Sequence, residues 1–109
     1  MEEARARAKY VRISPLKVKK VADLVQSKNA KEAMDILTFV RGKGSEKIRE
    51  VLKSAMANAR NTSSLDPESF RVKALIGKGS TFKRTRPRAR GRADLVRRRT
   101  SHITIILES

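Results

Sequence analysis

Positions 83–99 read KRTRPRARGRADLVRRR. Nine of these seventeen residues are Lys or Arg, one residue, Asp94, is acidic, and the large aliphatic side chains are Leu95 and Val96. No core can hold such a stretch, because burying even one unpaired charge costs more than a domain's net stability allows. The stretch therefore predicts a segment that leaves the folded body and meets an anionic partner.

Strand-like patterns flank the basic stretch on both sides. Alternating residues over 70–76 are apolar before it, and SHITIILE (101–108) alternates in the same way after it. We expect 70–82 and 92–107 to pair as one long hairpin, with PRARG (87–91) at or near its tip. At about 3.3 Å per residue, roughly a dozen residues beyond the core make an arm near 40 Å long. The side chains expected to face the core are Phe70, Val72, Ala74, Ile76, Ile103, Ile105 and Leu107.

The middle of the chain predicts three helices. Ser14-Pro15 starts the first, because Ser is preferred as N-cap and Pro fits the first helical turn. The second starts at Asn29, with Glu32 three residues on as in a capping box, and Gly42 suits its end. The third runs from about Ser45 to Arg60. The expected apolar stripes are Val18, Val21, Ala22 and Val25; Ala33, Ile36, Leu37 and Val40; and Ile48, Val51, Leu52, Ala55 and Ala59.

The N-terminal stretch EEARARAKYVRIS (2–14) alternates over seven positions, which favours a strand, although its alanines would also suit a helix. One face would hold Ala4, Ala6, Ala8 and Tyr10, and the other Arg5, Arg7 and Lys9. The whole pattern predicts an α+β fold: three helices packed on a small antiparallel sheet, with a long basic β-hairpin projecting from the core. We expect one domain, 1–109, with its core at about 1–76 plus 100–109 and its arm at about 77–99.

The charge of the chain points to an anionic partner. Lys and Arg number 27 against 11 Asp and Glu, a formal net charge of +16. A nucleic acid, an anionic membrane or an acidic protein could supply the counter-charge. The absence of an eighteen-residue apolar run, of a signal-peptide pattern in MEEARARAKY and of large apolar residues on the arm argues against a membrane partner. We expect a cytoplasmic protein, with a cleaved organelle-targeting segment left open.

Catalysis is not expected. The chain has no Cys and a single His, His102, so it lacks thiolate chemistry and a multi-histidine metal site, and we expect no cofactor. GKGS (77–80) lacks the strand–loop–helix context of a phosphate-binding loop, and its glycines instead predict a bulge or bend in the arm. Aromatic residues make up 4% of the chain, which argues against a single-strand binder built on several stacking rings.

The composition of the arm favours contact with phosphates. Arg outnumbers Lys eight to one in 83–99, and Arg forks bidentately to phosphate and is less strongly hydrated. In an extended chain the arginines at 86, 88, 90 and 92 share one side, and Pro87, Ala89 and Gly91 share the other. Two alternatives remain: a solvated charge run, and the arm of a DNA-bending architectural protein whose Pro87 wedges between base steps.

Four stretches together resemble a known family. They are YVRISPLKVKKVADLV (10–25), SAMANARN (54–61), KRTRPRARGRAD (83–94) and RRTSHITII (98–106). The sequence resembles the bacterial large-subunit ribosomal protein twenty-two family, whose eukaryotic members are numbered seventeen. The resemblance covers nearly the whole chain. One departure is GKGSTF (77–82), where family members often have an acidic-Gly-Pro stretch before the arm.

The resemblance implies a structural role in the large ribosomal subunit. Family members bind large-subunit ribosomal RNA, act early in assembly, and line part of the nascent-peptide exit tunnel with the tip of the hairpin. Expected partners are therefore this RNA, neighbouring ribosomal proteins and the nascent peptide, with the free protein a monomer. Expected tip residues are Phe82, Lys83, Arg84, Pro87 and Arg88. Expected RNA contacts are Lys83, Arg84, Arg86, Arg88, Arg90, Arg92, Arg97, Arg98, Arg99, Thr100, Ser101, His102, Arg12, Lys17, Lys19 and Lys20.

Overall fold

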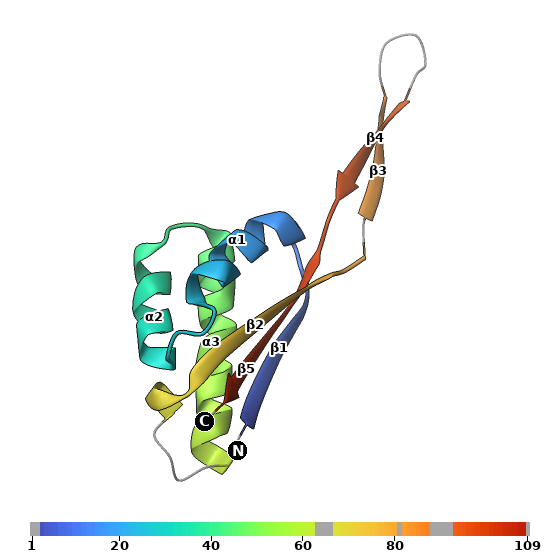
Figure 1. Ribbon diagram of the computed structural model, residues 1–109. Helices are drawn as coiled ribbons and strands as arrows, with labels where there is room; N and C mark the ends of the chain where they lie inside the picture. The colour runs from blue at the N-terminus through green and yellow to red at the C-terminus, as the bar shows by residue number, and fades with distance from the viewer. Residues whose placement is uncertain (1–2, 63–66, 81, 88–92, 109) are drawn as a thin grey trace.

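A sheet carrying three helices on one face, with a two-stranded arm leaving one end, makes up the molecule (Figure 1). The computed structural model describes the backbone at 3–62, 67–80, 82–87 and 93–108, and the side chains at 3–61, 68–80 and 99–108. The predicted α+β fold is confirmed. Its elements are β1 (Glu3–Val11), α1 (Pro15–Val25), α2 (Ala30–Phe39), α3 (Lys43–Thr62), a 3₁₀ turn η1 (Pro67–Ser69), β2 (Arg71–Lys78), β3 (Phe82–Pro87), β4 (Ala93–Arg98) and β5 (Ser101–Glu108).

The body sheet has the strand order β1-β5-β2, and both pairings are antiparallel. Ile105 pairs with Ala6 on one side and Ala74 on the other, so these three residues form one row across the sheet. Alternate residues on β5 point toward the helices, and Ile103, Ile105 and Leu107 are fully buried there. The core predicted from alternation is confirmed, with Ile76 half-buried at its margin.

The helices begin close to the predicted residues. Ser14 occupies the N-cap of α1 with Pro15 following, although the Ser14 side chain makes no capping hydrogen bond. Asn29 caps α2, and its Oδ1 accepts from the Glu32 N–H at 2.9 Å. The prediction for Gly42 is wrong: α2 ends at Phe39, and Gly42, with φ +130°, directly precedes α3. Its carbonyl accepts from the Glu46 N–H, so it starts α3 rather than ending α2.

The outer edge of β2 is covered by the connection between α1 and α2. Ser27 N–H donates to the Val72 carbonyl, and Val72 N–H donates to the Lys28 carbonyl at 2.8 Å. The Gln26 side-chain amide continues this pairing, because it donates to the Ala74 carbonyl and accepts from the Ala74 N–H. A glutamine side chain and a short loop thus satisfy the edge groups of β2 over 72–74, which blocks edge-to-edge association there.

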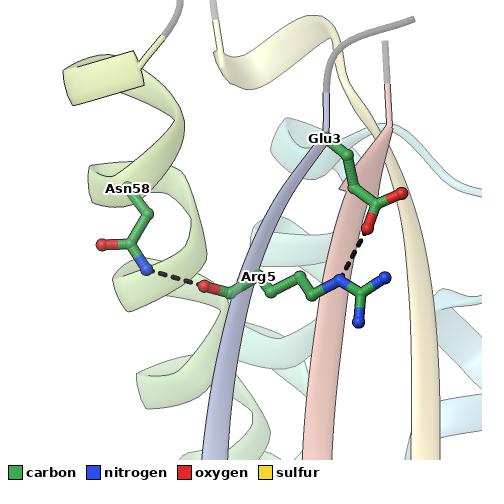
Figure 2. A network of polar contacts seen from close by, with 3 residues as sticks. All are labelled: Glu3, Arg5 and Asn58. Carbon is green, nitrogen blue, oxygen red and sulfur yellow. Dashed lines mark hydrogen bonds and ion pairs between the residues drawn. The ribbon is translucent and has the colours of Figure 1, made fainter.

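Helix α3 supports the opposite edge of the sheet by packing against β1. Ala55 and Ala59 are fully buried on α3, whereas Ala57 is exposed, so the close approach uses the first two of these small residues. The Asn58 amide also donates to the Arg5 carbonyl at 2.7 Å and ties the strand to the helix (Figure 2). Ala4, at 6% exposure, is buried in the core with Ala6 and Ala8 packed against it, so these three alanines share one face of β1 as predicted.

The face assigned to Tyr10 is where the expected alternation fails. Ala8 pairs with Ile103 and Val11 pairs with Ser101, so Lys9 and Tyr10 together oppose the single residue His102. This β-bulge shifts the register by one residue. Tyr10 has φ +56° and is 56% exposed, so it does not join the alanine face as expected.

The arm makes the molecule long. Its principal extents are 65 × 25 × 16 Å, and the radius of gyration is 17.0 Å. A compact domain of this length would have a radius of gyration of about 13 Å. The difference arises because β3 and β4 pair only with each other, as a separate two-stranded sheet outside the body (Figure 1).

Candidate nucleic-acid interface

The arm is an antiparallel ribbon built from the basic stretch. Phe82 pairs with Arg98, and the ladder runs to the pair Pro87 and Ala93. The backbone at 82–87 and 93–98 is described, while the side chains there and the whole of 88–92 lie outside the described residues. The expected RNA contacts and tip residues from 82 to 98 are therefore placed only by the backbone, or not at all. The ladder establishes that both halves of the basic stretch run side by side, with Phe82, Lys83 and Arg84 at the body end and Pro87 at the far end. The expectation that Phe82, Lys83 and Arg84 belong to the tip does not fit this ladder.

The arm joins the body through a change of register. Lys78 pairs with Ser101 in the body sheet, and Phe82 pairs with Arg98 in the arm. Three residues (79–81) separate these pairs on the outgoing strand, against two (99–100) on the returning strand. An extra residue on one strand bends and twists a ladder. The bulge predicted from GKGS is confirmed, and it separates the arm from the body sheet.

Gly79 and Thr100 close this bulge. Gly79 N–H donates to the Thr100 carbonyl at 3.0 Å, and Thr100 Oγ1 donates to the Ser80 carbonyl at 2.6 Å. A Cβ on residue 79 would lie 2.3 Å from Thr100 Oγ1, so the close approach of the two strands requires glycine here. At Gly77 the nearest atom to an added Cβ would be 3.6 Å away, which is an ordinary contact.

Two of the predicted contact residues are buried. Thr100 is 1% and Ser101 is 0% exposed, and the Ser101 hydroxyl donates to the Ile13 carbonyl. This burial leaves almost no surface for RNA, so the expectation of direct contact does not fit the structure. Both hydroxyls are used inside the protein, where they hold the root of the arm against the body.

His102 lies next to this root and is half-buried on the face of the sheet away from the helices. Its Nδ1 accepts from the Tyr10 N–H at 3.2 Å, and the two rings meet edge to face with centroids 4.8 Å apart. Because Nδ1 accepts, the proton of the neutral imidazole is on Nε2, where it is a donor. His102 thus holds the bulge of β1 and also presents a donor beside the arm.

Exposed cations surround the root of the arm. Arg12 and Arg99 are exposed, as are three lysines on α1, which lies at the end of the body from which the arm leaves (Figure 1). The open face of the body sheet adds further exposed cations on its two edge strands. The exposed cations of α1 and of this open face are Lys17, Lys19 and Lys20, and Arg5, Arg7, Lys9, Arg71 and Lys73.

Few of these body cations are neutralised by acids. Arg5 Nε lies 2.6 Å from Glu3 Oε1 in an exposed pair (Figure 2), and Lys47 pairs with Glu50 on α3. Glu68 aside, no other ion pair within the described side chains involves a body cation. Exposed pairs of this kind contribute little to stability. The remaining charges are therefore available to a polyanion.

Chemistry other than charge is sparse among the described residues. No group of three or more His, Cys, Asp or Glu side chains in those ranges could hold a metal ion. Among the same residues, no helix combines the length and apolar character needed to cross a membrane. The body therefore presents exposed cations and a histidine hydrogen-bond donor around the root of the arm.

Sequence reasoning missed three residues of this region. Gln26 was not recognised because side-chain pairing to a strand edge has no sequence signature. The role of Gly79 was foreseen only as an unspecified bulge, since its partner Thr100 is 21 residues away. Tyr10 was placed on the wrong face, and its positive φ has no local signal, because tyrosine rarely adopts that conformation.

Comparison with known proteins identifies the family. The family model described as "Ribosomal protein L22p/L17e" matches residues 6–108. The protein named "Large ribosomal subunit protein uL22" of Carboxydothermus hydrogenoformans is 51% identical over 106 residues, covering 96% of this chain and 94% of its own. Proteins of the same name from Syntrophomonas wolfei and Desulfitobacterium hafniense (strain Y51) are 50% and 46% identical, over 96% and 98% of this chain and 94% and 95% of their own. The resemblance seen in the sequence is thereby confirmed: the chain belongs to the ribosomal protein L22p/L17e family.

Proposed function

We propose that the protein is a structural constituent of the large ribosomal subunit that binds large-subunit ribosomal RNA and supports subunit assembly. The observation that carries this proposal is the basic ribbon, which projects from the body and holds nine Lys and Arg residues in 83–99. Its described strands, 82–87 and 93–98, pair with each other as a separate two-stranded sheet. RNA phosphates on both sides would supply the missing neutralisation through charge-assisted hydrogen bonds.

The proposal assigns different roles to the parts of the interface. The arm cations make the main phosphate contacts, and Arg12, Arg99 and the α1 lysines extend this contact to the RNA around the root. Thr100 and Ser101 position the arm from inside. The end of the arm, with Pro87 and Arg88, lines part of the nascent-peptide exit tunnel, as the family resemblance implies, whereas Phe82, Lys83 and Arg84 lie nearer the body along the ladder. Neighbouring ribosomal proteins are further partners, and the protein is a monomer before it joins cytoplasmic ribosomes.

Sedimentation tests the assignment directly. The protein carrying an affinity tag should sediment with large ribosomal subunits in a sucrose gradient. It should remain with them after a salt wash that removes loosely bound basic proteins. Recovery only at the top of the gradient would contradict the proposal. The alternative of a DNA-bending arm with Pro87 as a wedge predicts the opposite preference. Tighter binding to bent duplex DNA than to large-subunit RNA at physiological salt would favour that alternative.

Salt dependence tests whether the ribbon acts through phosphates. If roughly half to all of the nine arm cations neutralise phosphates, log affinity should fall with log salt at a slope of about −3 to −8. Filter binding with large-subunit RNA over about 50 to 300 mM salt measures this slope. A slope near zero would show that the arm does not bind as an electrostatic ribbon.

A further inference from the structure

The bulge at Tyr10 combines a strained backbone, an exposed aromatic ring and a contact with the one histidine of the chain. Tyr10 is held at φ +56°, a conformation that costs a non-glycine residue energy and is tolerated when surrounding contacts enforce it. Its N–H is bound by the His102 imidazole, and its ring stands against the edge of the same imidazole. Strain of this kind gathers at binding sites, where it fixes the direction of a side chain.

The ring that this strain positions is largely exposed. Tyr10 is 56% exposed, on the side of the sheet that carries His102. Gly77 is the partner of His102 on β2, and a Cβ there would lie 3.6 Å from the His102 Cβ. The flank of His102 opposite Tyr10 therefore carries no side chain. A planar group has access to the exposed Tyr10 ring, and the Gly77 position leaves His102 uncovered on its other side.

The charges near Tyr10 and His102 indicate what kind of molecule would carry this planar group. Lys9 shares the bulge with Tyr10, Arg7 lies one row along the same face, and Lys73 lies further along this face on β2; all three are exposed. The described acids of this sheet, Glu3 and Glu108, pair with each other at its far end, about 20 Å along β5. These exposed cations favour a negatively charged ligand. A flat ring joined to phosphate groups, as in a nucleotide, combines both requirements.

We propose that Tyr10 and His102 form a stacking site for one unpaired base of the RNA that the arm binds. The Tyr10 ring stacks on the base, and the His102 Nε2–H donates to the adjoining ribose or phosphate. Unpaired RNA bases are recognised in this way, by aromatic stacking next to backbone contacts. One ring suffices here, because the arm supplies the electrostatic affinity. This inference rests on the proposed RNA binding and adds a site for one unpaired base beside the root of the arm.

Tyrosine fluorescence provides a direct measurement. The chain has one Tyr and no Trp, so its emission reports on Tyr10 alone. Titration with bacterial large-subunit ribosomal RNA, corrected for the absorbance of the RNA, should quench this emission and saturate with binding. A fully paired RNA duplex offers no unstacked base and should bind with little quenching. Equal quenching by the duplex, or none by the ribosomal RNA despite binding, would overturn the proposal.

Substitutions separate stacking from structure. Tyr10→Gly removes the ring while adopting positive φ without strain, so its unfolding temperature should stay within about 5 °C of the unaltered protein. Its affinity for the ribosomal RNA should fall about 5- to 150-fold with an unchanged salt slope, because stacking releases no counterions. Tyr10→Phe should keep the affinity. Phe39→Ala, at an 86% exposed aromatic on α2 in the helical layer, should change nothing and serves as the matched control.

The outcomes also separate this inference from the proposed function. If the unaltered protein fails to bind large-subunit RNA, the proposed function itself is wrong. If the unaltered protein binds and folded Tyr10→Gly binds equally well, the stacking site is wrong while RNA binding by the arm stands. A loss of affinity that flattens the salt slope would place Tyr10 among the electrostatic contacts and would likewise overturn stacking.

Discussion

The strand pair β2–β5 and the strand pair β3–β4 are made from the same two stretches of chain, one continuing into the other across 79–81 and 99–100. In the body, β5 lies between two partners under a layer of helices, and Ile103, Ile105 and Leu107 are fully buried. In the arm each strand has a single partner, and the pair carries a dense positive charge. Antiparallel pairing is therefore common to the body and the arm, whereas burial of apolar side chains is seen in the body.

The difference shows where stability comes from in a sheet. A two-stranded ribbon in water is marginal, whereas a third strand and a covering helix supply apolar burial. The segment 83–94 holds six cations and one acid, a net charge of +5, so repulsion opposes its ordering. We therefore expect the body to be stable by itself and the ordering of the arm to depend on an anionic partner. Four experiments test this difference between the body and the arm.

The largest effect is expected in amide hydrogen exchange. Central β5 amides should open only with global unfolding, at about 5–15 kcal/mol, while amides of 82–87 and 93–98 should exchange within a small factor of the unfolded rate. A difference of about 10³-fold or more should appear by mass spectrometry on the free protein. In the assembled subunit the arm amides should slow strongly. Equal protection of both regions in the free monomer would show that the ribbon is preformed without RNA.

Removal of the arm separates folding from binding. Replacing 83–97 with Asn-Gly joins Phe82 to its own ladder partner Arg98 through a two-residue turn and deletes seven of the nine arm cations. Affinity for large-subunit RNA should fall roughly 10³-fold or more at low salt. Helix content by circular dichroism should be unchanged, because the helical core has no residue in the deleted segment. An unfolded product would show that the division into body and arm is wrong.

A core substitution tests the body in the opposite direction. Leu52 on α3 is fully buried, so Leu52→Ala should lower the free energy of unfolding by about 2–5 kcal/mol through the cavity it leaves. RNA affinity of the folded fraction should not change. The control is Leu16→Ala on α1, where the side chain is 68% exposed and the expected change is within about 0.5 kcal/mol. Similar losses at both positions in urea unfolding would contradict the assignment of the core.

The smallest effect is expected at the junction itself. Gly79→Ala should cost about 1–3 kcal/mol of unfolding free energy, because the new Cβ displaces the Thr100 hydroxyl from its bond to the Ser80 carbonyl. Gly77→Ala should be neutral within about 0.5 kcal/mol, since its Cβ meets only ordinary contacts. Thermal unfolding of the two variants side by side measures the difference. Equal stability would mean that the bulge relaxes without cost.

Helix starts and the inward face of β5 could be predicted from the sequence, because each depends on a single local pattern. Ser14-Pro15 and Asn29 marked the starts of α1 and α2, and the alternation of 101–108 placed Ile103, Ile105 and Leu107 inward. Predictions failed where two signals competed. Gly42 suits a helix end or a helix start equally well, and only the position of α3 decides between them. At the candidate site, the hydroxyls of Thr100 and Ser101 suggested RNA contact, and their burial assigns them to the root of the arm.

The division into a core with three apolar helix stripes and a segment too charged to be buried in that core follows from the sequence alone. The reason is that hydrophobic burial and charge desolvation depend on the types of residue and their spacing. Tertiary structure decided how the two are joined. The bulge at Gly79 depends on Thr100 across the ladder, the cover of β2 depends on Gln26, and the strained Tyr10 depends on His102, 92 residues away. These contacts link residues far apart in the chain, so their energies exist only once the strands are in register.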